Sequence, residues 1–158
     1  ELGLMLGGSV LENATIVGLG RKIKGFFVNI RKHPALIEPL VEKLRIKVPD
    51  VWTEVVYLSG GNQQKIVVAK WLNMNPEIMM LDEPTAGVDI GAKGEIIDLI
   101  RKFADEGKGV LFVSSELTEL MAVCDRIIVL FDGKITGCLT RKEINAEEEL
   151  QHAIQQSN

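Results

Sequence analysis

Cysteine is scarce in this sequence of 158 residues, and the two thiols that it has form no motif. Cys124 and Cys138 lie apart and lack C-x-x-C spacing, so a cysteine-based metal site is not expected. We expect both side chains to be free, partly buried thiols in a reducing compartment, because disulfides form mainly in oxidising ones.

Long apolar runs are missing as well. No run approaches the roughly 18 apolar residues that a transmembrane helix needs, and the first residues lack the layout of a signal peptide. We therefore expect a soluble chain that stays in the compartment where it is made. Its 46% hydrophobic content is enough for one core with a smaller satellite subdomain.

An excess of positive charge is also absent. The sequence has 18 Lys and Arg residues against 22 Asp and Glu residues, which gives a net charge of −4. The basic cluster of Arg21, Lys22 and Lys24 is short enough to be a solvated loop. Because nucleic-acid binding depends on clustered positive charge, we expect no nucleic-acid partner.

Aromatic and histidine side chains are few. Trp52 and Trp71 are expected to fill the core or a subdomain interface rather than to stack on a base. His33 lies beside a proline and His152 lies in a polar tail, so we expect both at the surface.

Two neighbouring motifs indicate a function. Ser59, Gly60 and Gly61 lead into a predicted helix over 61–73, of which Gly61 is the first residue, and a hydroxyl with free N–H groups at a helix start forms an anion site. Asp82 and Glu83 follow an apolar run, where one carboxylate suits Mg²⁺ and the other can orient attacking water. Together the two motifs predict hydrolysis of a nucleoside triphosphate.

Each motif also has a purely structural interpretation. Ser59 with the two glycines could be only a turn that opens a helix, since serine caps helices. Asp82 and Glu83 could be a solvated strand end, and Asp89 could be a plain helix N-cap. The presence of both motifs at their usual separation favours ligand binding, and for Asp89 the two roles are compatible.

The same residues carry a resemblance to a known family. LSGGNQQK (58–65), IMMLDEP (78–84) and AGVD (86–89) resemble the signature loop, Walker B strand and D-loop of ATP-binding cassette (ABC) ATPases. More narrowly, SGGNQQK, DEPTAGVDIGAK and VSSEL are similar to the second cassette of the tandem ATPases that power bacterial ribose, galactose and other monosaccharide importers. The resemblance runs from about residue 3 to about residue 140.

This resemblance implies roles for individual residues. Contact with ATP held on the opposite cassette is implied for Ser59, Gly60, Gly61 and Asn62, and contact with that cassette for Asp89. Asp82 would hold Mg²⁺ through water, and Glu83 would orient the attacking water as general base. Ser115 stands where most relatives have a histidine, and a serine can donate a hydrogen bond but cannot carry positive charge.

One family motif has no match in this sequence. The P-loop, G-x-x-x-x-G-K-[ST], should precede the signature, and neither 18–22 nor 91–94 matches it or follows a convincing strand. The resemblance therefore implies the C-terminal part of a cassette, which we expect to be inactive as an isolated chain.

The predicted fold class is α/β, a fragment of a P-loop NTPase of the ABC type. We expect a helical subdomain over 1–73, part of a nucleotide-binding core with a mainly parallel sheet over 74–140, and a tail helix over 141–158. In the first part we expect a helix opened by a capping box at 9–12, a mobile connection at 18–33, and helices at 34–45 and 61–73. In the second part we expect strands at 78–81 and 110–113 inside a sheet covered on both faces, helices at 92–106 and 116–123, and a hairpin of 126–131 with 134–139 that caps the sheet edge. A last helix is expected from the capping box at 140–143 to about 154.

The resemblance also implies partners and a location. It implies an ATPase subunit, with ATP and Mg²⁺, that couples hydrolysis to uptake of a monosaccharide at the cytoplasmic face of the bacterial membrane. Its partners would be the opposite cassette, a transmembrane permease subunit and, indirectly, a sugar-binding protein. Two alternatives stay open: a non-transport ABC ATPase of DNA repair, chromosome structure or translation, and a non-catalytic interaction module.

Overall fold

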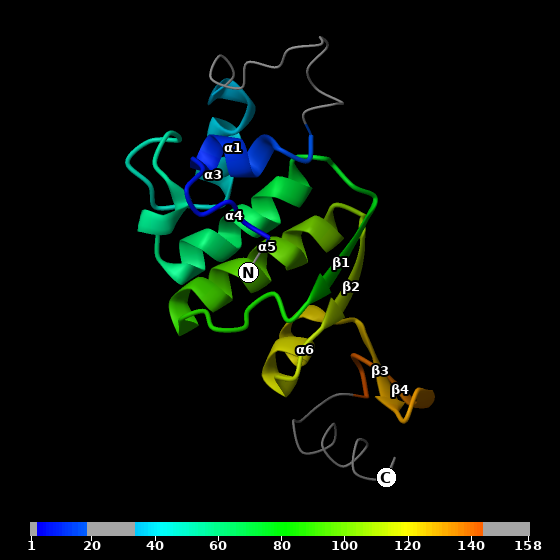
Figure 1. Cartoon of the computed structure of the whole chain (residues 1–158). Helices are drawn as coiled ribbons and strands as arrows, with labels where there is room; N and C mark the ends of the chain where they lie inside the picture. Colours follow the sequence, from blue (N-terminus) through cyan, green and yellow to red (C-terminus); the bar gives the residue numbers. More distant parts are fainter. Residues whose placement is uncertain (1–2, 19–33, 144–158) are drawn as a thin grey trace.

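Helices form one side of the molecule and strands the other in the computed structural model, which describes residues 3–18 and 34–143 (Figure 1). The elements in chain order are α1 (Val10–Thr15), the 3₁₀ helix η2 (Pro34–Leu36), α3 (Glu38–Lys43), the 3₁₀ helix η3 (Val55–Tyr57), α4 (Gly60–Leu72), β1 (Ile78–Asp82), α5 (Ile90–Asp105), β2 (Gly109–Val113), α6 (Leu117–Val123), β3 (Arg126–Phe131) and β4 (Lys134–Thr140). The predictions for the basic cluster, both histidines, the connection after residue 18 and the tail helix lie outside the described residues.

The predicted capping box opens α1. The Ser9 side chain accepts from the Glu12 N–H at 3.1 Å, and the Glu12 carboxylate accepts from the Ser9 N–H at 2.8 Å. This reciprocal pair satisfies donors that a helix start leaves unpaired. Its buried face then packs on α4, which confirms the prediction of a short helix here.

One predicted helix is divided in the structure. A single helix from Pro34 to about Arg45 is expected, but η2 ends before Ile37 and α3 begins after it. Pro39 is the reason, because it has no N–H to donate and its ring would clash with the carbonyl four residues earlier in a continuous helix. Placed in the first turn of α3, Pro39 leaves no hydrogen bond unmade.

The helix α4 forms as predicted, although its centre is β-branched. The β-branched run alone would favour a strand, but Ile66 and Val68 are buried in the helical core, so tertiary packing decides in favour of the helix. The cluster around them joins several elements and consists of Val10, Leu44, Ile46, Val55, Ile66, Ala69 and Leu99. Since Leu99 belongs to α5, this core crosses the predicted boundary between 73 and 74.

β1 and β2 pair in parallel, with α5 as the crossover between them. Asp82 lies opposite Val113 at the carboxyl ends of the two strands. Ile96, Leu99, Ile100 and Phe103 form the buried face of α5, as predicted, and Gly107 follows the helix with φ of +84°. The parallel pairing and the crossover confirm the α/β class.

The prediction of a sheet covered on both faces is wrong for the described residues. Met79 and Phe112 are buried, but Ile78 is 69% exposed and Met80 is 75% exposed. Leu111 and Val113 are half-exposed on β2. The reason is that α5 and α6 cover one face only, while alternate side chains of each strand point to the other face.

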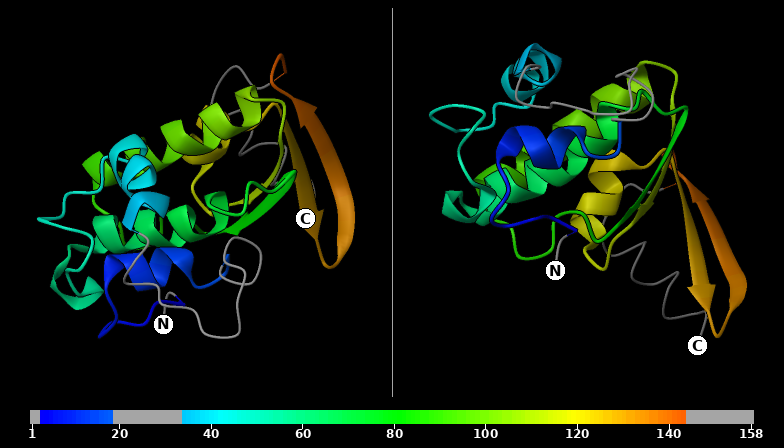
Figure 2. Two further views of the ribbon diagram at one scale, coloured as in Figure 1. Left: turned by 90° about the horizontal axis from the view of Figure 1, so that it is seen from above. Right: turned by 45° about the horizontal axis from the view of Figure 1, so that its top comes forward.

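The hairpin of β3 and β4 forms its own two-stranded sheet. Its turn residues Asp132 and Gly133 both have positive φ, at 46° and 72°, as a tight hairpin turn requires. In the described part of the chain neither strand pairs with β1 or β2, so the predicted cap on the parallel sheet edge is not formed by backbone hydrogen bonds. Figure 2 shows the hairpin on the far side of the molecule from α1.

Within the described ranges, no helix combines the length and the apolar composition that crossing a bilayer requires.

An ion pair with a buried lysine and a partly exposed glutamate joins α4 to α5, which lie side by side in Figure 2. Lys65 is 2% exposed, donates to the carbonyl oxygen of Arg45 at 3.1 Å and pairs with Glu95. The Lys65 ammonium lowers the pKa of Glu95. A carboxylate whose pKa is depressed by folding stabilises the protein at neutral pH, and this contribution is lost as the pH falls through that lowered pKa.

We predict that Glu95→Ala destabilises the protein by about 2 kcal/mol, because it leaves a buried ammonium without its carboxylate. Glu106→Ala, at the C-cap of the same helix, is the control, since Glu106 pairs with Lys43 at the surface, and it should cost no more than about 0.5 kcal/mol. Urea unfolding at neutral pH measures both. Equal losses for the two variants would contradict the prediction.

Candidate functional site

The carboxyl ends of β1 and β2 bring the predicted catalytic residues together. Asp82 closes β1 and is exposed, and its side chain has no hydrogen bond or ion pair within residues 3–18 and 34–143. The next residue, Glu83, donates its N–H to the carbonyl oxygen of Val113 at 2.9 Å. We call Asp82, Glu83 and Ser115 the strand-end site.

Glu83 has an unusual backbone and a fixed side chain. Its φ is +45°, a left-handed conformation that costs a residue with a side chain on the order of 1 kcal/mol. One carboxylate oxygen, Oε1, accepts from the Ser115 N–H at 2.7 Å. The sequence indicates the Ser115 hydroxyl as the functional group, whereas the observed contact uses its backbone.

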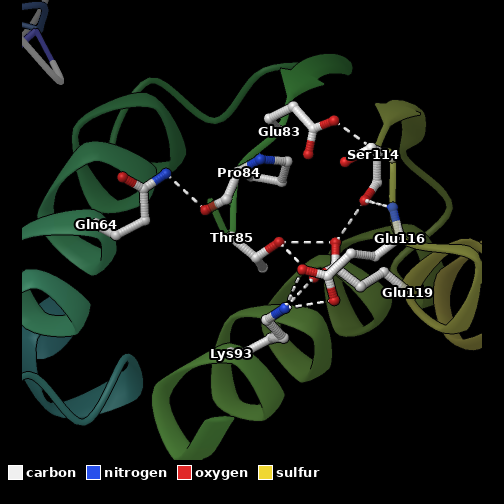
Figure 3. Close-up of polar contacts among 9 residues, drawn as sticks. Gln64, Glu83, Pro84, Thr85, Lys93, Ser114, Glu116 and Glu119 are labelled. Atoms are coloured by element: carbon white, nitrogen blue, oxygen red, sulfur yellow. Dashed lines mark hydrogen bonds and ion pairs between the residues drawn. The ribbon is translucent and has the colours of Figure 1, made fainter. Parts of the chain in front are cut away.

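A buried polar cluster lies directly behind this site. The Glu119 carboxylate accepts from the hydroxyls of Thr85 and Ser114, each at 2.7 Å, and pairs with the Lys93 ammonium at 2.9 Å. Lys93 also donates to both oxygens of Glu116 at 2.6 Å. Figure 3 shows these side chains converging from α5, α6 and the segments that follow β1 and β2.

The cluster keeps its charges despite burial. Burial raises the pKa of Glu119, but donation by Lys93, Thr85 and Ser114 outweighs it, so the pKa is lowered overall. Hydrogen bonds to Glu116 and Glu119 raise the pKa of Lys93. The charged forms of Glu119 and Lys93 therefore stabilise each other at neutral pH.

The signature turn, residues 59–62, opens α4. Ser59 is the N-cap, and its Oγ accepts from the backbone N–H and the side-chain Nδ2 of Asn62 at 3.4 and 3.0 Å. Asn62 Oδ1 accepts from the Lys47 N–H at 2.9 Å. The Asn62 amide thus joins the turn to the segment after α3, a structural role that the sequence does not reveal.

The two glycines of the turn differ in their surroundings. A Cβ added to Gly61 would lie 2.4 Å from the Cβ of Ala92, so the start of α4 approaches α5 too closely for any side chain. A Cβ on the exposed Gly60 would meet only the carbonyl oxygen of Gly87, at 3.9 Å. Packing alone explains why residue 61 is a glycine, but it does not explain why residue 60 is one.

Asp89 caps α5, and Gln64 connects the start of α4 to the segment after β1. Asp89 caps α5, and its Oδ1 accepts from the Ala92 N–H at 3.0 Å, which confirms the N-cap interpretation. Gln64 lies five residues after Ser59, and its Nε2 donates to the carbonyl oxygen of Pro84 at 2.6 Å. The start of α4 and the segment after Glu83 are therefore directly bonded.

The donors present fit part of a Mg-ATP site. The N-terminus of α4 offers N–H groups beside the exposed Ser59 and Gly60, which suits a phosphate oxygen. Asp82 offers an unpaired carboxylate of the oxygen type that Mg²⁺ prefers. The described residues hold no group of three or more acidic, histidine or cysteine side chains around one metal position, so Asp82 would supply one member of a larger ligand set.

Sequence reasoning missed the residues behind the site, namely Gln64, Thr85, Lys93, Ser114 and Glu119. A signal existed for Glu119, because it precedes Val123 by four residues and so shares the buried face of α6. The structure brings Asp82, Glu83 and Ser115 together. It places the signature turn and Asp89 at the neighbouring starts of α4 and α5.

Comparisons with known proteins agree with this geometry. Residues 7–86, half of the chain, match the family described as ABC transporter. The chain is 44% identical over 146 residues to the L-arabinose transport ATP-binding protein AraG of Geobacillus stearothermophilus, covering 92% of this chain and 28% of that protein. It is 44% identical over 154 residues to the ribose import ATP-binding protein RbsA 2 of Mesorhizobium japonicum, covering 98% of this chain and 30% of that protein.

The chain thus spans about 30% of the length of these curated relatives. A solved structure, the ATP-binding cassette MJ0796 in a dimeric post-hydrolysis state bound to ADP and Pi, superposes with a TM-score of 0.73 at 24% identity. The superposition covers 89% of this chain and 60% of that one, and it shows that the fold is that of a P-loop NTPase. The family match and the fold together establish that this chain belongs to the ABC transporter family.

Proposed function

We propose that this chain is part of the ATPase subunit of a bacterial importer that couples ATP hydrolysis to uptake of a monosaccharide. The observation that carries the proposal is the strand-end site, where Asp82 and Glu83 close β1 and the Ser115 N–H fixes the Glu83 carboxylate. The relatives named for L-arabinose transport and ribose import support the sugar class.

The strand-end site supplies the groups that hydrolysis needs. Asp82 would hold Mg²⁺ through water, and bound Mg-ATP supplies the phosphoanhydride bond that is cleaved. The Ser115 N–H donates to Oε1 of Glu83, so the second oxygen of that carboxylate is left to orient water and accept its proton. The Ser115 hydroxyl lies at the same strand end and is a candidate donor to the terminal phosphate.

The signature turn serves a second nucleotide in this proposal. Ser59 and the N–H groups of Gly60 and Gly61 contact the terminal phosphate of ATP that is held on the opposite cassette. Asn62 keeps the turn in shape through its bonds to Ser59 and Lys47, and Asp89 extends the same surface. The exposure of Ser59 and Gly60 supports this assignment.

The proposal includes partners, a location and a division into parts. Residues 1–73 form the helical subdomain that meets a permease, 74–140 form part of the nucleotide-binding core, and 141–158 form a tail. The subunit would lie at the cytoplasmic face of the membrane and depend on an external sugar-binding protein. Lys65 with Glu95 and Gln64 with Pro84 would couple the first two parts mechanically.

We predict that Glu83→Gln lowers ATP turnover by a factor of roughly 100 or more while ATP still binds, because the amide keeps the shape but cannot take a proton. Asp82→Asn should mainly raise the Mg²⁺ concentration needed for half-maximal rate. ATPase assays on the assembled transporter with the other cassette silenced measure both. Turnover that survives Glu83→Gln unchanged means that Glu83 is not the base.

A second prediction separates the two glycines. Gly60→Ala should lower turnover at the opposite nucleotide by roughly 10-fold or more, since its methyl group obstructs a phosphate donor while the fold accepts it. Gly61→Ala should instead destabilise the fold by about 1–3 kcal/mol, because its Cβ overlaps Ala92. Turnover and urea unfolding are measured for both variants. Full turnover in Gly60→Ala would assign the turn a structural role only.

A third prediction concerns the chain by itself. The sequence has no G-x-x-x-x-G-K-[ST] loop, so the lysine and N–H groups that neutralise ATP phosphates are missing from it. The isolated chain should therefore show no micromolar affinity for Mg-ATP in calorimetric titration. It should also release no phosphate above the level of its own Glu83→Gln variant. Micromolar binding would show that the described site holds nucleotide unaided.

A further inference from the structure

Glu119 is the one acidic side chain in the buried class among residues 3–18 and 34–143. Its two oxygens are fully engaged, since Thr85 Oγ1 lies 2.7 Å from both, Ser114 Oγ lies 2.7 Å from Oε2 and Lys93 Nζ lies 2.9 Å from Oε1. A carboxylate is costly to bury, and this one is retained with a complete set of donors from three separate segments. That arrangement requires an explanation beyond the packing of the short helix α6.

The donors to Glu119 flank Glu83 on both sides. Thr85 follows Glu83 by two residues in the same segment. Ser114 immediately precedes Ser115, whose N–H donates to the Glu83 carboxylate. One buried carboxylate therefore holds the segment that carries Glu83 and also the segment that orients its side chain (Figure 3).

We propose that Glu119 is a positioning residue for Glu83: through Thr85 and Ser114 it fixes the left-handed backbone of Glu83 and the Ser115 N–H that aims the carboxylate. This inference rests on the proposed function of Glu83 as the base. A strained backbone persists only where its surroundings over-determine it, and the Glu119 cluster provides that constraint. Glu119 itself touches neither water nor phosphate in this role.

The chain offers a matched control for Glu119. Glu116 is the N-cap residue of α6 and bonds the same lysine through both carboxylate oxygens, but its side chain is 52% exposed and bonds neither Thr85 nor Ser114. Glu119→Gln removes the charge that both hydroxyls share, whereas Glu116→Gln removes only the outer partner of Lys93. A second pair of variants tests the hydrogen bond between Thr85 and Glu119 from the side of Thr85. Thr85→Val removes the hydroxyl that donates to Glu119, and Thr85→Ser keeps it.

The variants are tested in the whole subunit assembled with its permease and with the other cassette silenced. Glu119→Gln and Thr85→Val should each lower kcat by roughly 10-fold or more and change the KM for ATP by less than about threefold, because a misplaced base affects the chemical step and not binding. Glu116→Gln and Thr85→Ser should stay within about twofold of the unmodified protein.

Hydrogen exchange without nucleotide provides a readout that does not depend on turnover. The Ser115 amide is protected by its bond to Glu83, so its exchange should accelerate by roughly 10-fold in Glu119→Gln and Thr85→Val. It should stay unchanged in Glu116→Gln and Thr85→Ser. Should Glu119→Gln fail to fold, the Thr85 pair still decides the question.

If the exchange rate of the Ser115 amide is unchanged in both Thr85→Val and Glu119→Gln, the inference is wrong, even where ATP turnover falls. A fall in kcat that Glu116→Gln and Thr85→Ser reproduce equally also overturns it, because the effect then belongs to the stability of α6. The Glu83→Gln variant separates this failure from that of the proposed function. If Glu83→Gln keeps full turnover, the catalytic assignment fails and the positioning role fails with it, even where exchange at Ser115 changes.

Discussion

The parallel register of β1 and β2 is the constraint on which the rest of the site depends. It places Asp82 opposite Val113, so the chain leaves both strands at the same level and on the same edge of the sheet. Glu83 can then bond the end of β2 through its backbone and the next segment through its side chain. A slip of one residue would turn Asp82 and every side chain on the strand to the opposite face.

Polar contacts, as well as apolar packing, hold α4 against α5 and the segment after β1. Gln64 bonds the Pro84 carbonyl, Lys65 pairs with Glu95, and Gly61 admits the start of α5 where no side chain fits. Such contacts depend on direction and distance, so they fix the relation between α4 and α5 more narrowly than an apolar interface does. The signature turn and the strand ends consequently keep a defined spacing.

The open face of the parallel sheet is the main departure from what the sequence indicates. An apolar strand with no polar alternation reads as covered on both sides, yet Ile78 and Met80 are mostly exposed here. The hydrophobic pattern of a strand shows which side chains favour burial. It does not show whether a helix or another segment among the described residues covers that face of the sheet. The divided helix around Pro39 has a local cause instead, and the position of that proline in the sequence could have predicted it.

The sequence by itself determined the elements with strong local signals: the capping box at Ser9, the Asp132-Gly133 turn and the helix α5. It also indicated Asp82 and Glu83, because an acidic pair after an apolar run is visible as a pattern. Only the tertiary structure decided that the Ser115 backbone contacts Glu83 and that Glu119 lies buried beside Thr85 and Ser114. The physical reason is that the contacts of Ser115 with Glu83 and of Thr85 with Glu119 join residues 32 and 34 positions apart, where chain spacing sets no distance. The crossover through α5 brings the two strand ends together.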